Sequence, residues 1–353
     1  MISFRFKNVR IESFAVNLPS QRVTSEEIEK RLEPLYKKLK IPFGTLEKLT
    51  NIRARHFWGP DVLPSQVSTV AAHKALETLS FAKDDIRAVF SCSITRDYFE
   101  PSSACIVHHD LGLAEDSLVL DITNACLGFM NGLTVMSNLI ESGIVRAGLV
   151  VSGETITRPF ENCVDYILAQ ENLTRDELIQ LLPTLTLGSG AVAYVLCHSS
   201  LSDRGPKVLG GVTKSDSANH DLCNGNGDFC ISQMHDFNPI MRTESQKLIS
   251  AAATLGGRTW KQASEVLGWS ADDIDHIFCH QVGKQVNEAF YNEVGVDYTK
   301  EFTIYQEYGN LASAALPTAL VLGSEQKEMK RGDKVLMLGY GSGINSNFLG
   351  LEW

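Results

Sequence analysis

The sequence predicts an α/β fold made of two similar halves, and two observations support this prediction. Residues 84–92 read DDIRAVFSC and residues 272–280 read DDIDHIFCH, and a helix-like stretch precedes each copy. At a similar distance after each copy come a tight turn, a small-residue helix, a Gly-bearing turn and a buried strand. Strands that alternate with helices are typical of βαβ units, so we expect mostly parallel sheets. Chance similarity between generic βα units is the alternative, which the shared DDI and the parallel order disfavour.

The two halves are predicted at residues 1–200 and 201–353, packed face to face about a pseudo-twofold axis. The boundary falls in the polar, turn-rich stretch 199–206. Residues 160–187 read as an insertion with a helical pattern, and such excursions often shape a binding site or a subunit interface. Residues 215–240 are rich in Asn, Asp and Gly, which favours a loop.

Composition excludes several classes of protein. The 353 residues are 44% hydrophobic and carry a net charge of −10, which argues against a nucleic-acid surface. No apolar run approaches the roughly 18–20 residues of a membrane span. The eight cysteines contain no CxxC pair. We therefore expect neither a disulfide framework nor a zinc site, and we predict a cytoplasmic protein without a bound metal.

Cys126 is the candidate nucleophile. It follows the apolar run SLVLDI and a short turn, and small residues then begin a helix, which places the thiol at or near a helix N-terminus. The helix dipole and the free N–H groups there favour a thiolate, so we expect the pKa of Cys126 to lie below its usual value. Gly128 and Gly132 are poor helix formers, and their presence indicates close packing against this helix. A buried structural cysteine is the alternative interpretation.

The supporting groups are expected at equivalent places in the second half. His280 ends the strand-like run DHIFCH, and the internal repeat aligns Asn310, in YGNLASAALP, close to Cys126. A single His at a strand end is more often structural, but the alignment favours convergence of all three residues where the halves meet. The run Gly339-Tyr-Gly341-Ser-Gly343 lies between two strands, so it is no dinucleotide loop. A Gly-rich turn of this kind lets backbone N–H groups approach a ligand, as an oxyanion hole requires.

Together the runs NACLGF, HQVG, YGNLASAALP and GYGSGI resemble the thiolase superfamily, in the branch of 3-oxoacyl-ACP synthase III. The resemblance spans nearly the whole chain and includes LTNIRARHFW at 49–58. It implies a thiolase fold, which is a five-layered αβαβα sandwich, a homodimer, and a catalytic triad of Cys126, His280 and Asn310. It also implies an oxyanion hole made by the backbone N–H groups of Cys126 and Ser342.

Within that branch, RDYFEPS (96–102) and NACLGFMNG are most similar to OleA, the long-chain acyl-CoA head-to-head condensing family. The resemblance implies that Glu100 enters the active site of the neighbouring subunit and acts as the base. Malonyl thioesters form their own carbanion by losing carbon dioxide, whereas an unactivated acyl thioester needs a carboxylate to remove its α-proton. The alternative is an exposed loop carboxylate, the default for a Glu before Pro.

The family resemblance implies fatty acyl-CoA or acyl-ACP substrates and no cofactor besides the coenzyme A thioester that reacts. Arg158 matches a CoA-contacting arginine of the branch. Two departures leave the carrier open: HQVG stands in place of HQAN, and Thr45 and Leu49 stand where other members have the Trp and Arg that clamp the adenine. Two alternative functions also remain open, namely a decarboxylative synthase that uses malonyl-ACP or malonyl-CoA, and a non-catalytic subunit that supports an active paralogue.

Overall fold

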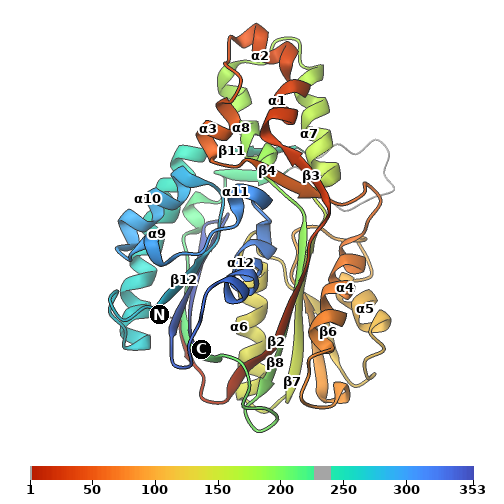
Figure 1. The fold of residues 1–353 in the computed structure, drawn as a ribbon, viewed down its shortest axis with the longest axis vertical. Helices are drawn as coiled ribbons and strands as arrows, with labels where there is room; N and C mark the ends of the chain where they lie inside the picture. Colours follow the sequence, from red (N-terminus) through yellow and green to blue (C-terminus); the bar gives the residue numbers. More distant parts are fainter. Residues whose placement is uncertain (1, 226–239) are drawn as a thin grey trace.

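The computed structural model describes residues 2–225 and 240–353, and one long mixed sheet runs through it (Figure 1). The strand order is β12-β13-β14-β9-β2-β8-β7-β5-β6, and β1 pairs with β9. These strands are β1 (Ile2–Arg5), β2 (Val9–Asn17), β5 (Ile86–Ser91), β6 (Leu118–Asp121), β7 (Ala147–Glu154), β8 (Gly190–His198), β9 (Lys207–Ser215), β12 (His276–Cys279), β13 (Lys334–Gly341) and β14 (Asn345–Glu352).

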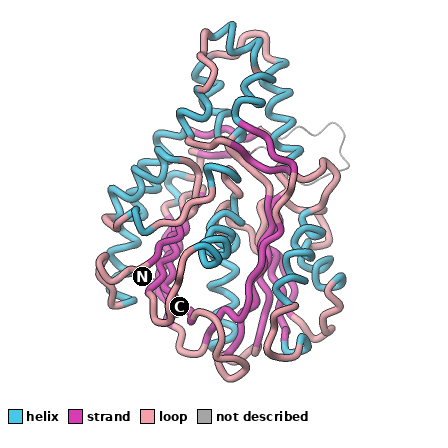
Figure 2. Tube along the Cα trace, viewed as in Figure 1, coloured by secondary structure: helices cyan, strands magenta, loops and turns pink. Residues whose placement is uncertain are grey.

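The sheet has two parts with helices between them and on both outer sides (Figures 1 and 2). Two helices fill the middle, and the main core cluster lies around them, with Phe129 and Leu320 fully buried. The parts of the sheet meet through a single residue pair between β2 and β9. The five layers confirm the predicted αβαβα fold class. The helices of these layers are α4 (Pro64–Leu76) and α5 (Ser103–Asp110) outside one part, α6 (Gly128–Glu141) and α12 (Ala315–Gln326) between, and α9 (Ser245–Leu267) and α10 (Lys284–Val294) outside the other.

The expectation of mostly parallel sheets is wrong. Only β5–β6, β5–β7 and β12–β13 are parallel among the pairs of the described sheet, whereas β7–β8, β2–β8, β9–β14 and β13–β14 are antiparallel. In the first half β8 returns antiparallel to β7 after two helices, Thr157–Ala169 and Arg175–Leu185, whereas in the second half the last strand returns through a tight turn. Three residues join β13 to β14, and such a short connection permits only antiparallel pairing.

A smaller layer caps one end of the molecule, at the top of Figure 1. The predicted insertion at 160–187 forms two helices here, and they pack on the N-terminal helices around buried Ile28 and Phe160. Short two-stranded sheets lie beneath them. The elements of the cap are α1 (Ser25–Arg31), α2 (Glu33–Leu39), α3 (Thr45–Thr50), α7 (Thr157–Ala169), α8 (Arg175–Leu185), β3 (Gln21–Thr24) with β4 (Ala54–Phe57), and β10 (Cys223–Gly225) with β11 (Met241–Thr243).

The segment between the halves agrees with its prediction where it is described. β8 ends at His198 and β9 begins at Lys207, so residues 199–206 form the connection, and the division into 1–200 and 201–353 stays our proposal. The predicted loop at 215–240 contains the short helix Ser217–Asn219 and β10, and its residues 226–239, Cys230 among them, lie outside the described residues. The remaining short helices are Lys83–Asp85, Tyr298–Lys300, α11 (Tyr305–Tyr308) and Ala312–Ala314.

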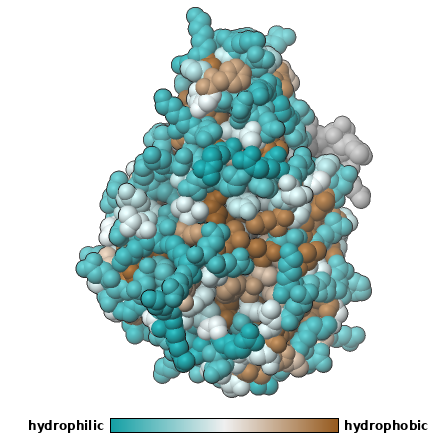
Figure 3. All heavy atoms as spheres, viewed as in Figure 1, coloured by the Kyte–Doolittle hydropathy of each residue, from teal (hydrophilic) through white to brown (hydrophobic). Residues whose placement is uncertain are grey.

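On the face seen in Figure 3, hydrophilic side chains cover most of the surface, and hydrophobic ones gather near the centre, around α12 and the neighbouring strands. None of the helices in the described part of the chain is both long and apolar enough to cross a membrane.

Candidate active site at the junction of the two halves

Cys126 lies in the turn that connects β6 to α6. The preceding residue, Ala125, has a left-handed backbone with φ of +47°, which is uncommon and strained for a residue with a side chain. Two backbone hydrogen bonds close the turn, from Leu127 N to the oxygen of Asn124 at 2.9 Å and from Gly128 N to the oxygen of Ala125 at 3.2 Å. The helix itself begins at Gly128. The predicted placement of Cys126 near a helix N-terminus is therefore confirmed, two residues before the first helical residue.

The first turns of α6 pack tightly against the end of β5. A Cβ atom on Gly128 would lie 2.4 Å from the backbone oxygen of Cys92, and one on Gly132 would lie 2.4 Å from its sulfur. No side chain fits at either position. The close approach that the two glycines predicted is thus real, and Cys92 is the residue that they accommodate.

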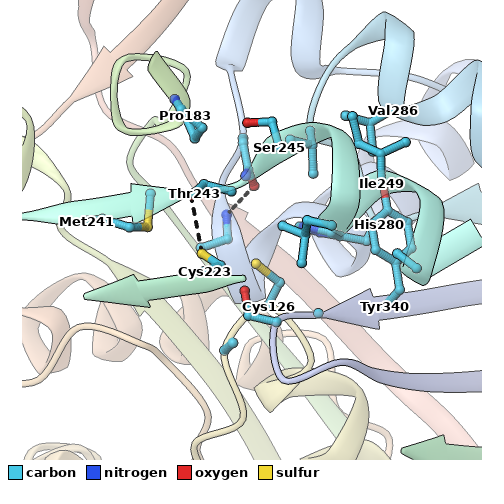
Figure 4. Close-up of a pocket in the computed structure, with 18 of the residues that line it drawn as sticks. Cys126, Pro183, Cys223, Met241, Thr243, Ser245, Ile249, His280, Val286 and Tyr340 are labelled. Atoms are coloured by element: carbon cyan, nitrogen blue, oxygen red, sulfur yellow. Dashed lines mark hydrogen bonds between the residues drawn. The ribbon is translucent and has the colours of Figure 1, made fainter. Parts of the chain in front are cut away.

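Cys126, His280 and Asn310 line one cavity of about 170 Å³. Figure 4 shows Cys126 and His280 pointing into it from different sides. Cys126 comes from the first half, whereas His280 follows β12 and Asn310 precedes α12, both in the second. The cavity therefore lies where the two halves meet, as the sequence predicted.

His280 is almost completely buried, with 2% of its surface exposed. Its amide donates to the oxygen of Leu338 on β13, and the ring of Tyr340 meets the imidazole edge-on at 5.1 Å between centroids. Burial lowers the pKa of His280 to about 3, so the imidazole is neutral at physiological pH. Its Nδ1 atom has no hydrogen-bond partner among the described residues.

The side-chain amide of Asn310 is oriented by its own turn. The Oδ1 atom accepts a hydrogen bond from Ala312 N at 2.9 Å. The backbone of Asn310 is also bonded to both Thr186 and Gly188, at the end of α8 and just beyond it. Because the carboxamide oxygen is engaged, the NH₂ group is the part of the side chain that remains to donate into the cavity.

The Gly-rich turn after β13 lies directly against Cys126. A Cβ atom on Gly341 would stand 3.4 Å from Cys126 N and 3.3 Å from Leu127 N, so the backbone approaches this amide closely. Ser342, the next residue, lines the same cavity. β14 follows the turn and no helix does, which agrees with the rejection of a dinucleotide loop.

The expected lowering of the thiol pKa is wrong for this structure. Burial raises the pKa of Cys126 to about 12, and the charges of Cys223 and Glu154 act in the same direction. The sequence located the helix terminus correctly, but it did not reveal that the sulfur lies inside the protein, where loss of hydration disfavours a thiolate. Cys126 is therefore a thiol that shares its cavity with a neutral imidazole.

Comparisons with known proteins identify the family of this chain. The family model for 3-oxoacyl-[acyl-carrier-protein] synthase III matches residues 120–217, and the model for the C-terminal part of that family matches residues 265–353. The chain belongs to the 3-oxoacyl-ACP synthase III family. Both matched segments contain residues of the cavity, with Cys126 in the first and His280 and Asn310 in the second.

Several relatives match this synthase III chain over nearly its whole length. The acyl-CoA:acyl-CoA alkyltransferase of Xanthomonas campestris is 34% identical over 348 residues, which cover 99% of each chain. That of Shewanella oneidensis is 35% identical over 354 residues, covering 99% of this chain and 100% of the other. The crystal structure of cerulenin-bound OleA from Xanthomonas campestris superimposes with a TM-score of 0.93 at 34% identity, covering 99% of this chain and 98% of that chain.

The rest of the cavity of this family member is mostly apolar. α8, α9 and the segments beside His280 supply aliphatic side chains, and the predicted insertion thus contributes to the site through its last turn. The apolar lining consists of Ile94, Pro183, Leu187, Met241, Leu248, Ile249, Ala252, Val282 and Val286. A cavity of this character suits a hydrocarbon chain better than a polar ligand.

Glu100 and Arg158 do not line the cavity of their own chain. Glu100 is exposed and lies in a loop between β5 and α5, next to Phe99, which is 79% exposed. Arg158, near the start of α7, donates from Nε to the oxygen of Pro60 at 2.8 Å and pairs with Asp61 at 2.6 Å. Neither position tests the role that the resemblance implied.

Sequence reasoning missed two parts of the site. Cys223 and Thr243 line the cavity from β10 and β11, and their side chains contact each other at 3.4 Å (Figure 4). The Asn- and Gly-rich composition of this segment concealed the two short strands. Glu154, the last residue of β7, is fully buried beside the cavity. A carboxylate that directly follows the apolar run AGLVVSG was the signal that could have identified it.

Among residues 2–225 and 240–353, no group of three His, Cys, Asp or Glu side chains could hold a metal ion. His108 and His109 are adjacent residues on α5. The ring of His108 contacts the backbone oxygen of Ala114.

Proposed function

We propose that this chain condenses two fatty acyl-CoA molecules head to head through an acyl thioester on Cys126. The observation that carries the proposal is the convergence of Cys126, His280 and Asn310 in one mainly apolar cavity. It occurs in a chain that is 34% identical over 99% of its length to an acyl-CoA:acyl-CoA alkyltransferase. The chemistry uses coenzyme A thioesters and no further cofactor.

The first half-reaction loads the acyl group. The sulfur of Cys126 attacks the thioester carbonyl while the neutral imidazole of His280 accepts the thiol proton, so the high pKa of the thiol is overcome during attack. The backbone N–H groups of Cys126 and Ser342 stabilise the negative oxygen of the tetrahedral intermediate. Coenzyme A then leaves with the proton, and the acyl chain occupies the apolar part of the cavity.

The second half-reaction forms the carbon–carbon bond. Glu100 of a second copy removes the α-proton of a second acyl-CoA, and His280 and Asn310 donate hydrogen bonds to the resulting enolate oxygen. The enolate carbon attacks the acyl carbonyl on Cys126. The sulfur leaves as the new bond forms, takes up a proton, and a 2-alkyl-3-oxoacyl-CoA is released.

Solved structures of the Xanthomonas campestris OleA support both the substrate and the glutamate. One of them contains lauric acid and lauroyl-CoA bound to a variant whose cysteine is replaced by serine. Others carry a glutamate replaced by Gln, Ala or Asp. In that protein the glutamate precedes the cysteine by the same number of residues that separate Glu100 from Cys126.

The exposure of Glu100 supports a homodimer. Its carboxylate cannot act in the cavity of its own chain, which it does not line, so a partner must receive it. β6, the strand that leads to Cys126, is one of the two edges of the described sheet, and Leu118 on it is 42% exposed. An edge strand with exposed apolar side chains is a ready surface for pairing with a second copy.

The decisive experiment is to incubate the pure protein with a long-chain acyl-CoA alone. The proposal expects an acyl mass shift on the Cys126 peptide and then a β-keto acid or the ketone formed from it. A strict requirement for malonyl-CoA or malonyl-ACP, with release of carbon dioxide, would instead identify a decarboxylative synthase. Absence of any mass shift on Cys126 would leave the non-catalytic subunit as the better description.

A further inference from the structure

Three side-chain amides form a chain of hydrogen bonds across the junction of the two halves. Asn131 lies on α6, Asn124 lies in the turn between β6 and α6, and Asn345 begins β14. Asn124 donates from Nδ2 to Oδ1 of Asn131 at 2.8 Å. Asn345 donates from Nδ2 to Oδ1 of Asn124 at 3.1 Å and to the backbone oxygen of Ser342 at 3.3 Å. One carboxamide therefore joins the turn that precedes α6 to the Gly-rich turn after β13.

The backbone oxygen of Ser342 fixes the direction of this chain. A backbone carbonyl can only accept, so the atom of Asn345 that faces it must be the NH₂ nitrogen. The other N–H of the same nitrogen meets the side-chain oxygen of Asn124. A carboxamide offers two N–H groups on one atom, whereas a hydroxyl offers one and an ionised carboxylate none. The side chain at position 345 is thus matched to two acceptors, one in each half of the chain.

The Gly-rich turn leaves room for this amide. Gly343 has φ of +124°, in the region that side chains rarely adopt, and a Cβ atom there would lie 2.7 Å from Nδ2 of Asn345. On the other side of Ser342, a Cβ atom on Gly341 would lie 3.4 Å from Cys126 N. The backbone on either side of Ser342 therefore stands close to one amide, that of Asn345 on one side and that of Cys126 on the other.

The other end of the link holds a strained part of the nucleophile turn. Ala125, with its left-handed backbone, lies between Asn124 and Cys126. Asn124 is held by its backbone oxygen, which accepts from Leu127 N, and by both ends of its side chain. A strained conformation persists only where the surrounding contacts over-determine it. The contact with Asn345 is one of these, and it acts two residues before the N–H of Cys126.

We propose that Asn345 is a positioning residue for the oxyanion hole, because it holds the turn of Cys126 and the turn of Ser342 at the spacing that one thioester oxygen requires. The inference rests on the proposed function, in which the N–H groups of these two residues stabilise the oxyanion. Such donors act only when both lie about 2.7–3.1 Å from the place where the charged oxygen forms. The two donors belong to different halves, so their spacing depends on contacts between the halves, and Asn345 makes such a contact at the site itself.

The test compares two reactions of Cys126, both followed by intact-protein mass spectrometry. Acyl transfer from a long-chain acyl-CoA builds negative charge on a carbonyl oxygen, whereas alkylation by iodoacetamide displaces iodide and builds no such charge. Asn345→Ala should slow acylation by about tenfold to a hundredfold, the effect of a displaced oxyanion donor. It should change alkylation by less than about twofold, because that reaction depends on the thiolate and its access alone.

Asn347→Ala is the matched control. Asn347 lies on the same strand, is buried, and also donates two hydrogen bonds to α6, to Met130 O at 3.2 Å and to Thr134 Oγ1 at 2.9 Å. It does not line the cavity. This variant should keep the wild-type ratio of acylation to alkylation. If it lowers the ratio as much as Asn345→Ala does, or if Asn345→Ala leaves the ratio unchanged, the inference is overturned.

Asn124→Ala breaks the same link from the other half, and it decides the question if Asn345→Ala does not fold. It should also lower the ratio of acylation to alkylation, and an unchanged ratio would contradict the inference. Because both variants remove one shared hydrogen bond, the double variant should be slowed by less than the product of the two single effects. Effects that multiply fully would show two independent contributions and no link between the turns.

A fatty acyl thioester of N-acetylcysteamine separates this inference from the proposed function, because it carries the reacting group without the nucleotide of coenzyme A. If this probe labels Cys126 and acyl-CoA does not, the proposed acyl-CoA substrate is wrong, and the ratio measured with the probe still decides the role of Asn345. If acyl-CoA labels Cys126 and the ratio is the same in Asn345→Ala, the inference alone fails. If neither thioester labels Cys126, both are overturned.

Discussion

The cavity around Cys126 and the loop around Glu100 differ in almost every physical respect. The cavity lies at the junction of the two halves, its imidazole is neutral, and its thiol pKa is raised by burial. The Glu100 loop is exposed and stands next to an exposed phenylalanine. The residues proposed for acylation therefore lie in the cavity of one chain, whereas Glu100, the proposed base for condensation, is exposed on its surface. The contrast indicates that the two half-reactions depend on different numbers of chains.

The largest expected effect is the loss of acylation in Cys126→Ala. Removing the nucleophile should lower the rate of acyl transfer by on the order of 10⁴-fold or more, because the proposed thioester forms on the sulfur of Cys126. Intact-protein mass spectrometry after mixing with acyl-CoA measures this directly. Cys223→Ala is the control, since Cys223 lines the same cavity and its loss should leave the mass shift in place. Acyl transfer to Cys223 in the Cys126→Ala variant would contradict the assignment.

The next largest effect is expected at Glu100, and it distinguishes the Glu100 loop from the cavity around Cys126. Glu100→Ala should leave acylation of Cys126 unchanged and slow condensation by about 10²–10⁴-fold, the usual contribution of a general base. The measurements are the Cys126 mass shift and the yield of β-keto product from the same sample. Glu115→Ala replaces another exposed carboxylate of the same half and should change neither. Condensation at the full rate in Glu100→Ala would show that another group is the base.

Mixing the two inactive variants tests whether the two regions belong to different chains. Cys126→Ala and Glu100→Ala protomers are unfolded and refolded together, or coexpressed. If Glu100 acts in the partner's cavity, a mixed dimer holds one complete site, so the mixture should recover roughly a quarter of wild-type condensation. Recovery must disappear when either variant is assayed by itself. Lack of recovery in verified mixed dimers would place the base in its own chain.

Stability offers a third way to contrast a buried and an exposed glutamate. Because the pKa of Glu154 is raised to about 7 from 4.5, the unfolded chain releases this proton at lower pH than the folded chain. Between these two pKa values the folded state binds more protons than the unfolded state. The contribution of Glu154 to the free energy of unfolding therefore falls by about 3 kcal/mol as the pH rises, and it stays constant above pH 7. Glu154→Gln does not titrate. Its stability relative to wild type should therefore rise between pH 4.5 and 7, which denaturant unfolding at each pH measures. Glu100→Gln should show changes within about 0.5 kcal/mol, as expected at an exposed site.

The sequence predicted many of the elements from local patterns and the convergence at Cys126 from the internal repeat, whereas the five layers were implied by the resemblance to the thiolase superfamily. Buried runs after helix-like stretches fixed β5, β7, β12 and β13, and the small-residue segments fixed α6 and α12. The direction of strand pairing was wrong because it depends on how the chain returns to the sheet: β14 follows β13 after a tight turn, whereas β8 returns antiparallel to β7 after α7 and α8. The pKa of Cys126 was also wrong in direction, because a helix terminus is visible in one chain segment whereas burial is produced by segments far apart in sequence. Glu154 was overlooked for the same reason, since its donors lie about 60 and 159 residues away.

The smallest expected effect concerns Arg158, which lies in neither region. The structure records an ion pair between Arg158 and Asp61, so a contact with the phosphates of coenzyme A would have to compete with that pair. Exposed ion pairs contribute about 0.2–1 kcal/mol, so Arg158→Ala should raise the KM for acyl-CoA by roughly twofold to fivefold with little change in kcat. Asp61→Ala should lower the KM, because it releases the guanidinium for the substrate. If both variants shift the KM in the same direction, Arg158 stabilises the start of α7 and does not contact coenzyme A. Other residues must then bind the carrier.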